Sequence, residues 1–213
     1  MIPPDVAAGL RFDPKDHSYW IEKRQVHGVS RVLELGELKP PFYGDASGAM
    51  ALGTEVHKLT ELMDHGEDKG YDFSEKAETY RAGWVAFRKA FPFTIVECEQ
   101  PRYDATYDFA GTPDRIVVWR KVRTVVEIKT GQRYDWHRFQ TALYRQLSES
   151  TKRLIVYLSP KHPYGFRAEE HKAYTDWRDC QLALARIEAN RMEFQRAVSE
   201  PATPRRPWER SRA

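Results

Sequence analysis

The sequence predicts a protein that mixes α-helices and β-strands, in the α/β or α+β class, and three observations support this. Two adjacent apolar runs, residues 115–119 and 124–128, are separated by a short charged stretch, which predicts two strands joined by a turn. A third predicted strand, residues 153–159, has a continuous apolar centre, as expected for a strand covered on both faces. Apolar residues at helical spacing predict helices over residues 45–64, 74–90, 134–149 and 175–198.

The N-terminal part of the chain predicts a hairpin followed by a short helix. Alternating polar and apolar residues indicate a β-hairpin within residues 11–28, with its turn at residues 23–24. Ser30 can cap a helix that continues through Leu35, and Gly36 is expected to end it.

Two helices are predicted between this hairpin and the central strands. The first, residues 45–64, has a stripe of apolar residues that is expected to face the core: Ala49, Leu52, Val56, Leu59 and Met63. The second begins at an N-cap, Ser74, and ends before Pro92. Its aromatic residues follow helical spacing and are therefore read as core rather than as a base-stacking surface: Tyr80, Trp84, Phe87 and Phe91.

The remaining elements follow the same signals. Further strands are predicted over residues 93–99, 101–105, 107–110 and, at a sheet edge, 164–169. Asp135 is the expected N-cap of the helix over residues 134–149, which turns three residues to the core: Phe139, Leu143 and Leu147. Thr175 or Asp176 caps the last helix, whose predicted buried stripe is Trp177, Cys180, Leu184, Ile187, Phe194 and Val198.

Length and charge set limits on the organisation of the protein. A chain of 213 residues is long enough for one domain with a sizeable core, which we place at residues 1–200. Residues 201–213 form a tail rich in proline and arginine that we expect to be disordered. This tail carries the whole net charge of +3, so the rest of the chain is neutral and any nucleic-acid binding must come from local patches.

Cysteine usage and hydropathy exclude two further classes of protein. Cys98 and Cys180 are the only cysteines and lie far apart, which excludes an iron–sulfur cluster or a zinc site made mainly of thiolates. Two small buried thiols are the expected interpretation. The sequence has no secretory apolar region and no run long enough to span a bilayer, so we expect a cytoplasmic protein without a membrane partner.

The strongest chemical signal is a concentration of charge on the two central strands. Asp114 opens the first strand, and Glu127 and Lys129 lie on the second. Residues i and i+2 of a strand share a face, so Glu127 and Lys129 point the same way while Val126 and Ile128 point to the other layer. If the strands pair, Asp114 comes close to Glu127. Two carboxylates at one spot are costly unless a cation lies between them, which indicates a metal site.

Two helices add polar pairs that could face the same site. His57 and Glu61 are four residues apart on the first long helix, and Gln140 and Tyr144 are four apart on a later one. Taken alone, each pair is better explained as an ordinary surface or packing feature. Together with the strand carboxylates they form an ordered set, in which hard oxygen ligands suit Mg²⁺ or Mn²⁺ and the imidazole of His57 favours Mn²⁺. A cation with a lysine beside it is suited to phosphodiester hydrolysis.

Four motifs, in chain order, resemble those of the PD-(D/E)XK nuclease superfamily: GTEVHKLTE (residues 53–61), GTPD (111–114), EIK (127–129) and QTALY (140–144). Within that superfamily the chain is similar to the RecB-like, Cas4-like branch, which includes small phage exonucleases and the mitochondrial genome maintenance exonuclease. The segment FDPKDHSYW…HGVSRVL also resembles the N-terminal hairpin of the phage-type members. The cysteines that hold the iron–sulfur cluster of Cas4 are missing.

The resemblance implies a restriction-endonuclease-like fold, a mixed central β-sheet flanked by α-helices with an N-terminal β-hairpin. It implies that Mg²⁺ or Mn²⁺ is held by His57, Asp114, Glu127 and the backbone carbonyl of Ile128, and that Lys129 is the catalytic lysine. Gln140 and Tyr144 would position the scissile phosphate or brace the site. Glu61 would lie in a second shell or bind a second metal.

The resemblance further implies a metal-dependent DNA exonuclease that acts on single strands or duplex ends in replication, repair or phage recombination, with a single-strand annealing or binding protein as a further partner. Two alternatives stay open. One is a structure-selective or restriction-like endonuclease of the same superfamily. The other is a nuclease-fold protein that binds nucleic acid or a partner without cutting, which the intact set of motif residues disfavours.

Overall fold

The computed structural model describes residues 9–41 and 47–199 of the chain. The described elements are β1 (Leu10–Asp13), β2 (Ser18–Ile21), β3 (Arg24–Gly28), α1 (Val29–Leu35), α2 (Ser47–His65), α3 (Glu75–Glu78), α4 (Arg81–Ala90), β4 (Thr94–Cys98), β5 (Arg102–Asp104), β6 (Phe109–Gly111), β7 (Arg115–Trp119), β8 (Val122–Lys129), α5 (His137–Leu147), β9 (Lys152–Leu158), β10 (Phe166–Glu170) and α6 (Thr175–Ser199). Residue 45, the predicted start of the first long helix, lies outside the described residues, as does the tail 201–213. The single domain and the disordered tail therefore stay predictions.

The strands form two five-stranded sheets, each mixed in direction. One sheet has the order β1-β2-β3-β6-β5 and contains the predicted N-terminal hairpin, extended by β1. The second sheet has the order β10-β9-β8-β7-β4, with β10 at its edge as predicted. In this second sheet β8 pairs in parallel with β9 and antiparallel with β7. The mixed α/β fold expected from the sequence is confirmed.

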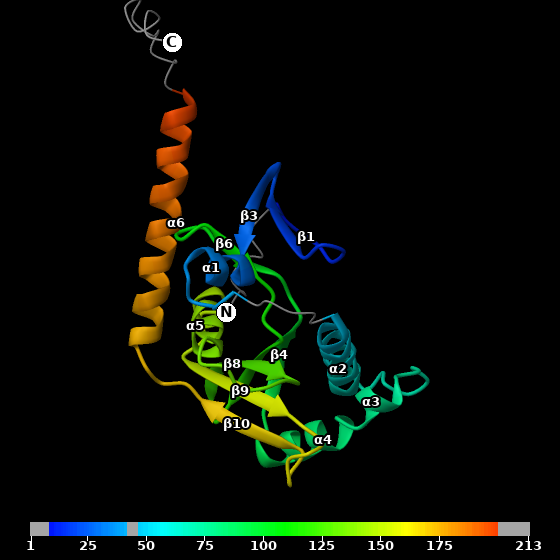
Figure 1. Cartoon of the computed structure of the whole chain (residues 1–213). Helices are drawn as coiled ribbons and strands as arrows, with labels where there is room; N and C mark the ends of the chain where they lie inside the picture. The colour runs from blue at the N-terminus through cyan, green and yellow to red at the C-terminus, as the bar shows by residue number, and fades with distance from the viewer. Residues whose placement is uncertain (1–8, 42–46, 200–213) are drawn as a thin grey trace, which may run out of the picture.

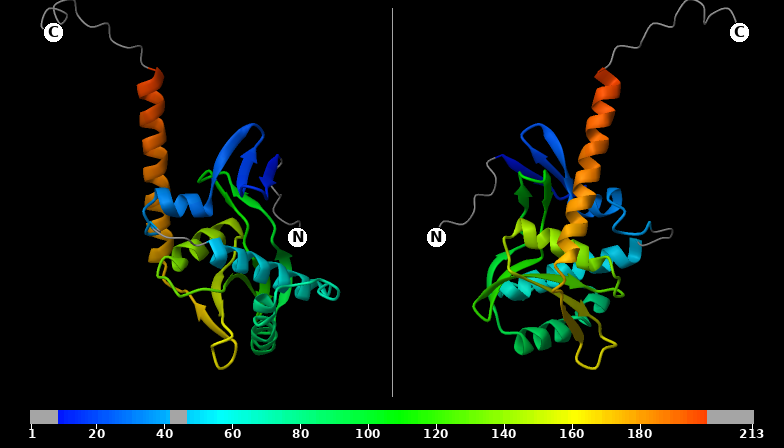
Figure 2. Two further views of the ribbon diagram at one scale, coloured as in Figure 1. Left: turned by 45° about the vertical axis from the view of Figure 1, so that its right-hand side comes forward. Right: turned by 90° about the vertical axis from the view of Figure 1, so that its left-hand side faces the viewer.

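Helices cover both faces of the second sheet (Figures 1 and 2). On one face, α2, α3 and α4 form one hydrophobic cluster with residues of β8 and β9: Val126, Ile128, Leu154, Val156 and Leu158. On the other face, α1, α5 and α6 pack with Val125 in a second cluster. Since Val125 and Val126 are adjacent on β8, the strand sends alternate side chains into the two layers, as the sequence pattern predicts. Glu127 and Lys129 therefore lie on the α5 face.

Core positions agree with the predicted stripes in most of the chain. The aromatic residues of the second predicted helix pack together, with Tyr80, Trp84 and Phe87 buried. Cys98 and Cys180 are both buried free thiols. Val198, the last predicted stripe position, lies outside the described side chains, and two of the described positions differ. Ala49 is exposed near the start of α2, and Phe194 is 71% exposed because α6 extends beyond the body of the protein at its C-terminal end (Figure 1).

Three predicted helix boundaries are wrong, and each has a local cause. Ser30 is not an N-cap, because β3 passes directly into α1 with Gly28 at the capping position. Asp135 is not an N-cap either, since α5 begins after Trp136 and the Asp135 carboxylate pairs with Arg138. The helix expected over residues 74–90 begins at Ser74 as predicted but is interrupted, because the Tyr80 amide bonds the carbonyl of Ala77, three residues back.

Within the described residues, no helix combines the length and apolar character that crossing a membrane requires.

Candidate active site

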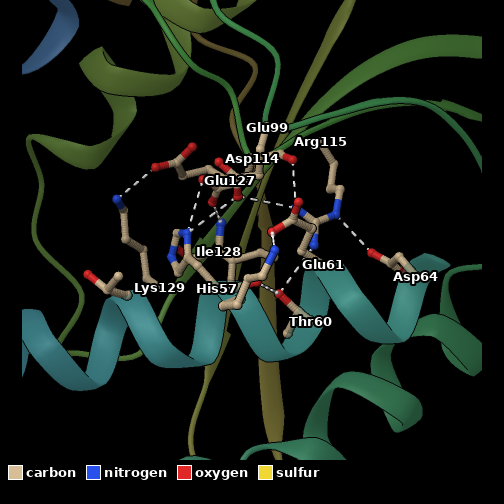
Figure 3. A network of polar contacts seen from close by, with 12 residues as sticks. His57, Thr60, Glu61, Asp64, Glu99, Asp114, Arg115, Glu127, Ile128 and Lys129 are labelled. Carbon is tan, nitrogen blue, oxygen red and sulfur yellow. Dashed lines mark hydrogen bonds and ion pairs between the residues drawn. The ribbon is translucent and has the colours of Figure 1, made fainter. Parts of the chain in front are cut away.

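The candidate site lies where α2 passes the ends of β7 and β8. His57, Thr60, Glu61 and Asp64 project from one side of α2 toward the two strands (Figure 3). The antiparallel pairing of β7 with β8 places Arg115 opposite Val126, so Asp114, directly before β7, lies beside the end of β8. The carboxylate of Asp114 accepts a hydrogen bond of 2.6 Å from the backbone amide of Ile128. The strand pairing itself therefore fixes Asp114 in the site.

The imidazole of His57 bridges α2 and these strands. Its Nε2 lies 3.1 Å from the carbonyl oxygen of Ile128, and its Nδ1 lies 3.2 Å from Oδ1 of Asp114. Burial lowers the pKa of His57, but the carboxylates of Asp114 and Glu99 outweigh this effect and raise it to about 10. The two acids thus favour a positive charge at this place, which either a protonated ring or a bound cation would supply.

Glu99 is a site residue that the sequence analysis missed. Its Oε1 lies 3.8 Å from Nδ1 of His57, and its backbone amide donates to the carbonyl of Asp114. The ligand atoms of His57, Glu99 and Asp114 all lie within 4.8 Å of one another, which is compatible with binding one metal ion. Burial and the nearby Asp114 raise the pKa of Glu99. The available signal was its position as the last residue of a predicted strand, residues 93–99.

Glu127 lies on the α5 face of β8 and is almost completely buried. Its Oε1 accepts two hydrogen bonds, 2.8 Å from Nζ of Lys129 and 2.9 Å from Nε2 of Gln140. Burial, followed by the negative charge of Asp114, raises the pKa of Glu127 to about 7. Lys129 thus shares a face with Glu127, as the strand pattern predicts, and its side chain remains 20% exposed.

Tyr144 lies one turn beyond Gln140 on α5 and packs beneath the GTPD motif. It is buried, and burial raises its pKa well above the usual value. Gly111 makes this packing possible. A Cβ at that position would come within 3.0 Å of side-chain atoms of Val29, Tyr144 and Leu147. The glycine of the motif therefore lets α5 approach the strand end closely, which brings Gln140 to Glu127.

Arg115 supports the site from the side of α2. Its side chain is completely buried and donates to Asp64 at 2.8 Å and to the backbone carbonyl of Asp114 at 2.7 Å. It also lies 3.3 Å from Glu99. Arg115 therefore links α2 to both acids of the cluster, although the sequence pattern suggested only the first residue of an apolar strand.

Glu61 makes its ion pair outside the group formed by His57, Glu99 and Asp114. It pairs with Lys58 at 3.0 Å, and its carboxylate comes within 4.8 Å of ligand atoms of His65 and Cys98. Glu127 is likewise not a member of the tight group formed by His57, Glu99 and Asp114, although their charges influence one another. The structure thus brings all the predicted site residues to one region and adds Glu99 to them.

The side chains present fit a divalent cation. Oε2 of Glu127 is buried and has no hydrogen-bond partner among the described residues, while Oε1 has two. A buried carboxylate oxygen without a partner is costly, and a cation would remove that cost. The available donors are carboxylate oxygens, one carbonyl oxygen and one imidazole, a set that suits Mg²⁺ or Mn²⁺.

The sequence matches no protein-family model and no curated protein. Several solved structures have a similar chain course. A candidate exonuclease from Eubacterium rectale is 8% identical, with a TM-score of 0.51 and 83% of each chain covered. An alkaline exonuclease from Laribacter hongkongensis is 13% identical, with a TM-score of 0.44, covering 81% of this chain and 92% of that one. A phage-related exonuclease from Haemophilus somnus is 9% identical, with a TM-score of 0.44, covering 82% and 96%.

Of these three structures, only the first has a TM-score above 0.5, and at 8% identity its likeness concerns the fold alone. The chain therefore shares its overall fold with that neighbour. This agrees with the four motifs that the sequence presents in order, and it leaves the roles of their residues to be tested by experiment.

Proposed function

We propose that this protein is a metal-dependent deoxyribonuclease that hydrolyses phosphodiester bonds from DNA ends. The observation that carries the proposal is the state of Glu127, a buried carboxylate. Lys129 and Gln140 hold one of its oxygens, and no described residue donates a hydrogen bond to the other. The neighbouring group of His57, Glu99 and Asp114 supplies further ligand atoms for a cation.

In this proposal His57, Asp114, Glu127 and the carbonyl of Ile128 hold Mg²⁺ or Mn²⁺. A bound divalent cation supplies Lewis acidity toward the phosphate and lowers the pKa of a water molecule. Lys129 orients the attacking water or offsets negative charge that develops on the phosphate, because its ammonium group lies beside Glu127 and is partly exposed. Gln140 fixes the orientation of Glu127 through its hydrogen bond.

The test of the site is Lys129→Ala, assayed on end-labelled DNA with Mg²⁺ or Mn²⁺. We expect the cleavage rate to fall by at least about 100-fold, since a positioned catalytic group contributes roughly that much. Lys152→Ala is the matched control, because Lys152 is also a strand lysine that pairs with a glutamate, Glu170. A Lys129→Ala protein that cuts as well as wild type would show that the site is assigned wrongly.

The choice of an exonuclease follows from the motifs and from the description of the Eubacterium rectale neighbour. Linear and covalently closed circular DNA of the same sequence distinguish the two modes of cutting. We expect the linear form to be degraded and the circular form to stay intact. Cleavage of the circle would favour the endonuclease alternative. Binding of DNA by wild type without any metal-dependent cleavage would favour a non-cutting protein.

A further inference from the structure

A pocket of about 290 Å³ opens beside the candidate site and plays no part in the chemistry proposed above. It lies past the ends of β8 and β9 and at the start of β10, and basic side chains line much of it: Arg133, Lys161, His162 and Arg167, with Tyr157. Arg133 and Arg167 have side chains that are 48% and 59% exposed. A concave basic surface of this kind suits an anionic ligand.

The pocket lies on the same face of the sheet as the catalytic side chains. Lys129 is the register partner of Tyr157 on β9, and Tyr157 is the partner of Arg167 on β10. Residues opposite one another on paired strands share a face, so these three side chains form one row across the sheet. Adjacent strands are about 4.8 Å apart, which places the backbone of Arg167 roughly 10 Å from that of Lys129.

The charge of the pocket is not balanced. Glu169 is the carboxylate between the two arginines, 3.0 Å from Arg133 and 2.5 Å from Arg167. Lys161 is exposed, and no ion-pair partner is found for its side chain within the described ranges 9–41 and 47–199. Two arginines share this one carboxylate, and Lys161 adds a further positive charge to the pocket lining. Shared pairing with Glu169 also holds the two guanidinium groups in place, so less side-chain entropy is lost when they bind an anion.

We propose that this pocket binds a backbone phosphate of the DNA strand, a few nucleotides from the phosphate that is cleaved at Lys129. The inference rests on the proposed function and extends it with a second contact to the same strand. The roughly 10 Å between the backbones of Lys129 and Arg167 is short enough for one DNA strand to reach both sites. The body of the chain has no net charge outside its tail, which makes a local patch the necessary source of electrostatic affinity.

The test compares Lys161→Ala/Arg167→Ala with wild type on substrates of different length. For a single-stranded oligonucleotide of about 12 nucleotides, we expect KM to rise about tenfold with kcat little changed. The dependence of log KM on log salt should also become shallower by about 0.7, the value for loss of one phosphate contact. Bis(p-nitrophenyl) phosphate, a single phosphodiester that cannot reach the pocket, should be hydrolysed equally well by both proteins.

Lys172→Ala/Arg186→Ala is the matched control. It removes one lysine and one arginine that are exposed, as Lys161 and Arg167 are, but that lie away from the pocket, where each pairs with a glutamate. This control should behave as wild type. An unchanged KM for the pocket variant, in a wild-type enzyme that cleaves DNA, would overturn the inference and leave the proposed function intact. So would a KM effect confined to 5′-phosphorylated strands, which would indicate a terminal phosphate. Absence of cleavage by wild type would instead overturn the proposed function.

Discussion

Gln140 donates a hydrogen bond of 2.9 Å to Oε1 of Glu127, the same carboxylate oxygen that accepts from Lys129. One oxygen of Glu127 therefore accepts two hydrogen bonds, while the second has no donor in the part of the chain that the structure describes. Side chains from helix α5 and strand β8 thus meet at a single oxygen atom. This arrangement makes the orientation of Glu127 depend on α5, and it can be tested directly.

Gln140→Leu should remove the hydrogen bond that orients Glu127, with little change in side-chain volume. We expect metal-dependent cleavage to fall by about 10- to 100-fold, the usual effect of losing a group that orients a metal ligand. The concentration of Mn²⁺ needed for half-maximal activity should rise in parallel. The readout is cleavage rate against Mn²⁺ concentration.

Gln146→Leu serves as its control, since Gln146 lies on the same helix and also bonds a carboxylate, that of Asp104, outside the site. Equal metal titrations for Gln140→Leu and Gln146→Leu would show that Glu127 needs no support from α5.

Glu99→Gln should weaken metal binding more than it changes the reaction at saturating metal. Glu99 belongs to the tight group with His57 and Asp114, so its loss removes one negative ligand while Glu127 and Lys129 stay in place. We expect the half-maximal Mn²⁺ concentration to rise by about tenfold or more, in line with the loss of a charged ligand. Glu97→Gln, two residues earlier and within β4, is the control, because Glu97 pairs with Arg102 and Arg123. An unaltered Mn²⁺ requirement would mean that Glu99 only balances the charge of Arg115 and His57.

Arg115→Met should destabilise the fold itself. The side chain of Arg115 is fully buried and its main partner, Asp64, is 4% exposed, so the substitution removes the nearer cation of a buried carboxylate and leaves Arg88 at 3.7 Å. Breaking such a pair costs about 3–5 kcal/mol of unfolding free energy. The measurement is urea unfolding, with Arg186→Met as the exposed comparison, for which we expect about 0–1 kcal/mol. The double variant Arg115→Met/Asp64→Leu should recover much of the loss, and a failure to recover would place the cost elsewhere.

The parts of the fold that were predictable are those fixed by local pattern. The hairpin of β7 and β8 follows from two apolar runs and a short charged turn, and the burial of Val126 and Ile128 follows from the two-residue period. The interruption of the helix at Tyr80 could not be read in the same way, because its aromatic stripe continues without a break across both helices. The parallel pairing of β3 with β6 joins segments about eighty residues apart, for which a single sequence gives no local signal.

The same distinction between local pattern and tertiary pairing applies to the candidate site. His57, Asp114, Glu127 and Lys129 belong to contiguous motifs, so their spacing could be recognised. Glu99 enters the site only because β4 pairs with β7, with an irregular register between Ile95 and Glu97, and because its backbone has a positive φ of 49°. Arg115 lies in a predicted strand, but its role as a buried cation depends on Asp64 from α2. Both are consequences of tertiary structure rather than of sequence period.

His137, at the start of α5, predicts a specific response of stability to acid. Its side chain is 3% exposed, and its Nδ1 lies 3.1 Å from the hydroxyl of Tyr157. Burial, and then nearby positive groups, of which Lys129 comes first and His171, Arg133 and Lys39 follow, lower the pKa of His137 to about 3. Between pH 6.5 and about 3 the unfolded chain therefore binds a proton that the folded protein does not. Stability falls as the pH falls, by up to about 1.4 kcal/mol per pH unit.

His137→Gln should remove this dependence, because an amide can still bond the Tyr157 hydroxyl but does not titrate. Measured by urea unfolding at about pH 8 and about pH 5, the wild type should lose about 2 kcal/mol more than the variant over this interval. The raised pKa of Glu127 acts with the opposite sign, since the folded protein binds that proton first and gains stability as the pH falls. Taking the difference between the two proteins cancels the contribution of Glu127. His17→Gln, which replaces an exposed histidine, should leave the wild-type slope unchanged. Parallel pH dependences for wild type and His137→Gln would show that His137 accepts a proton in the folded protein.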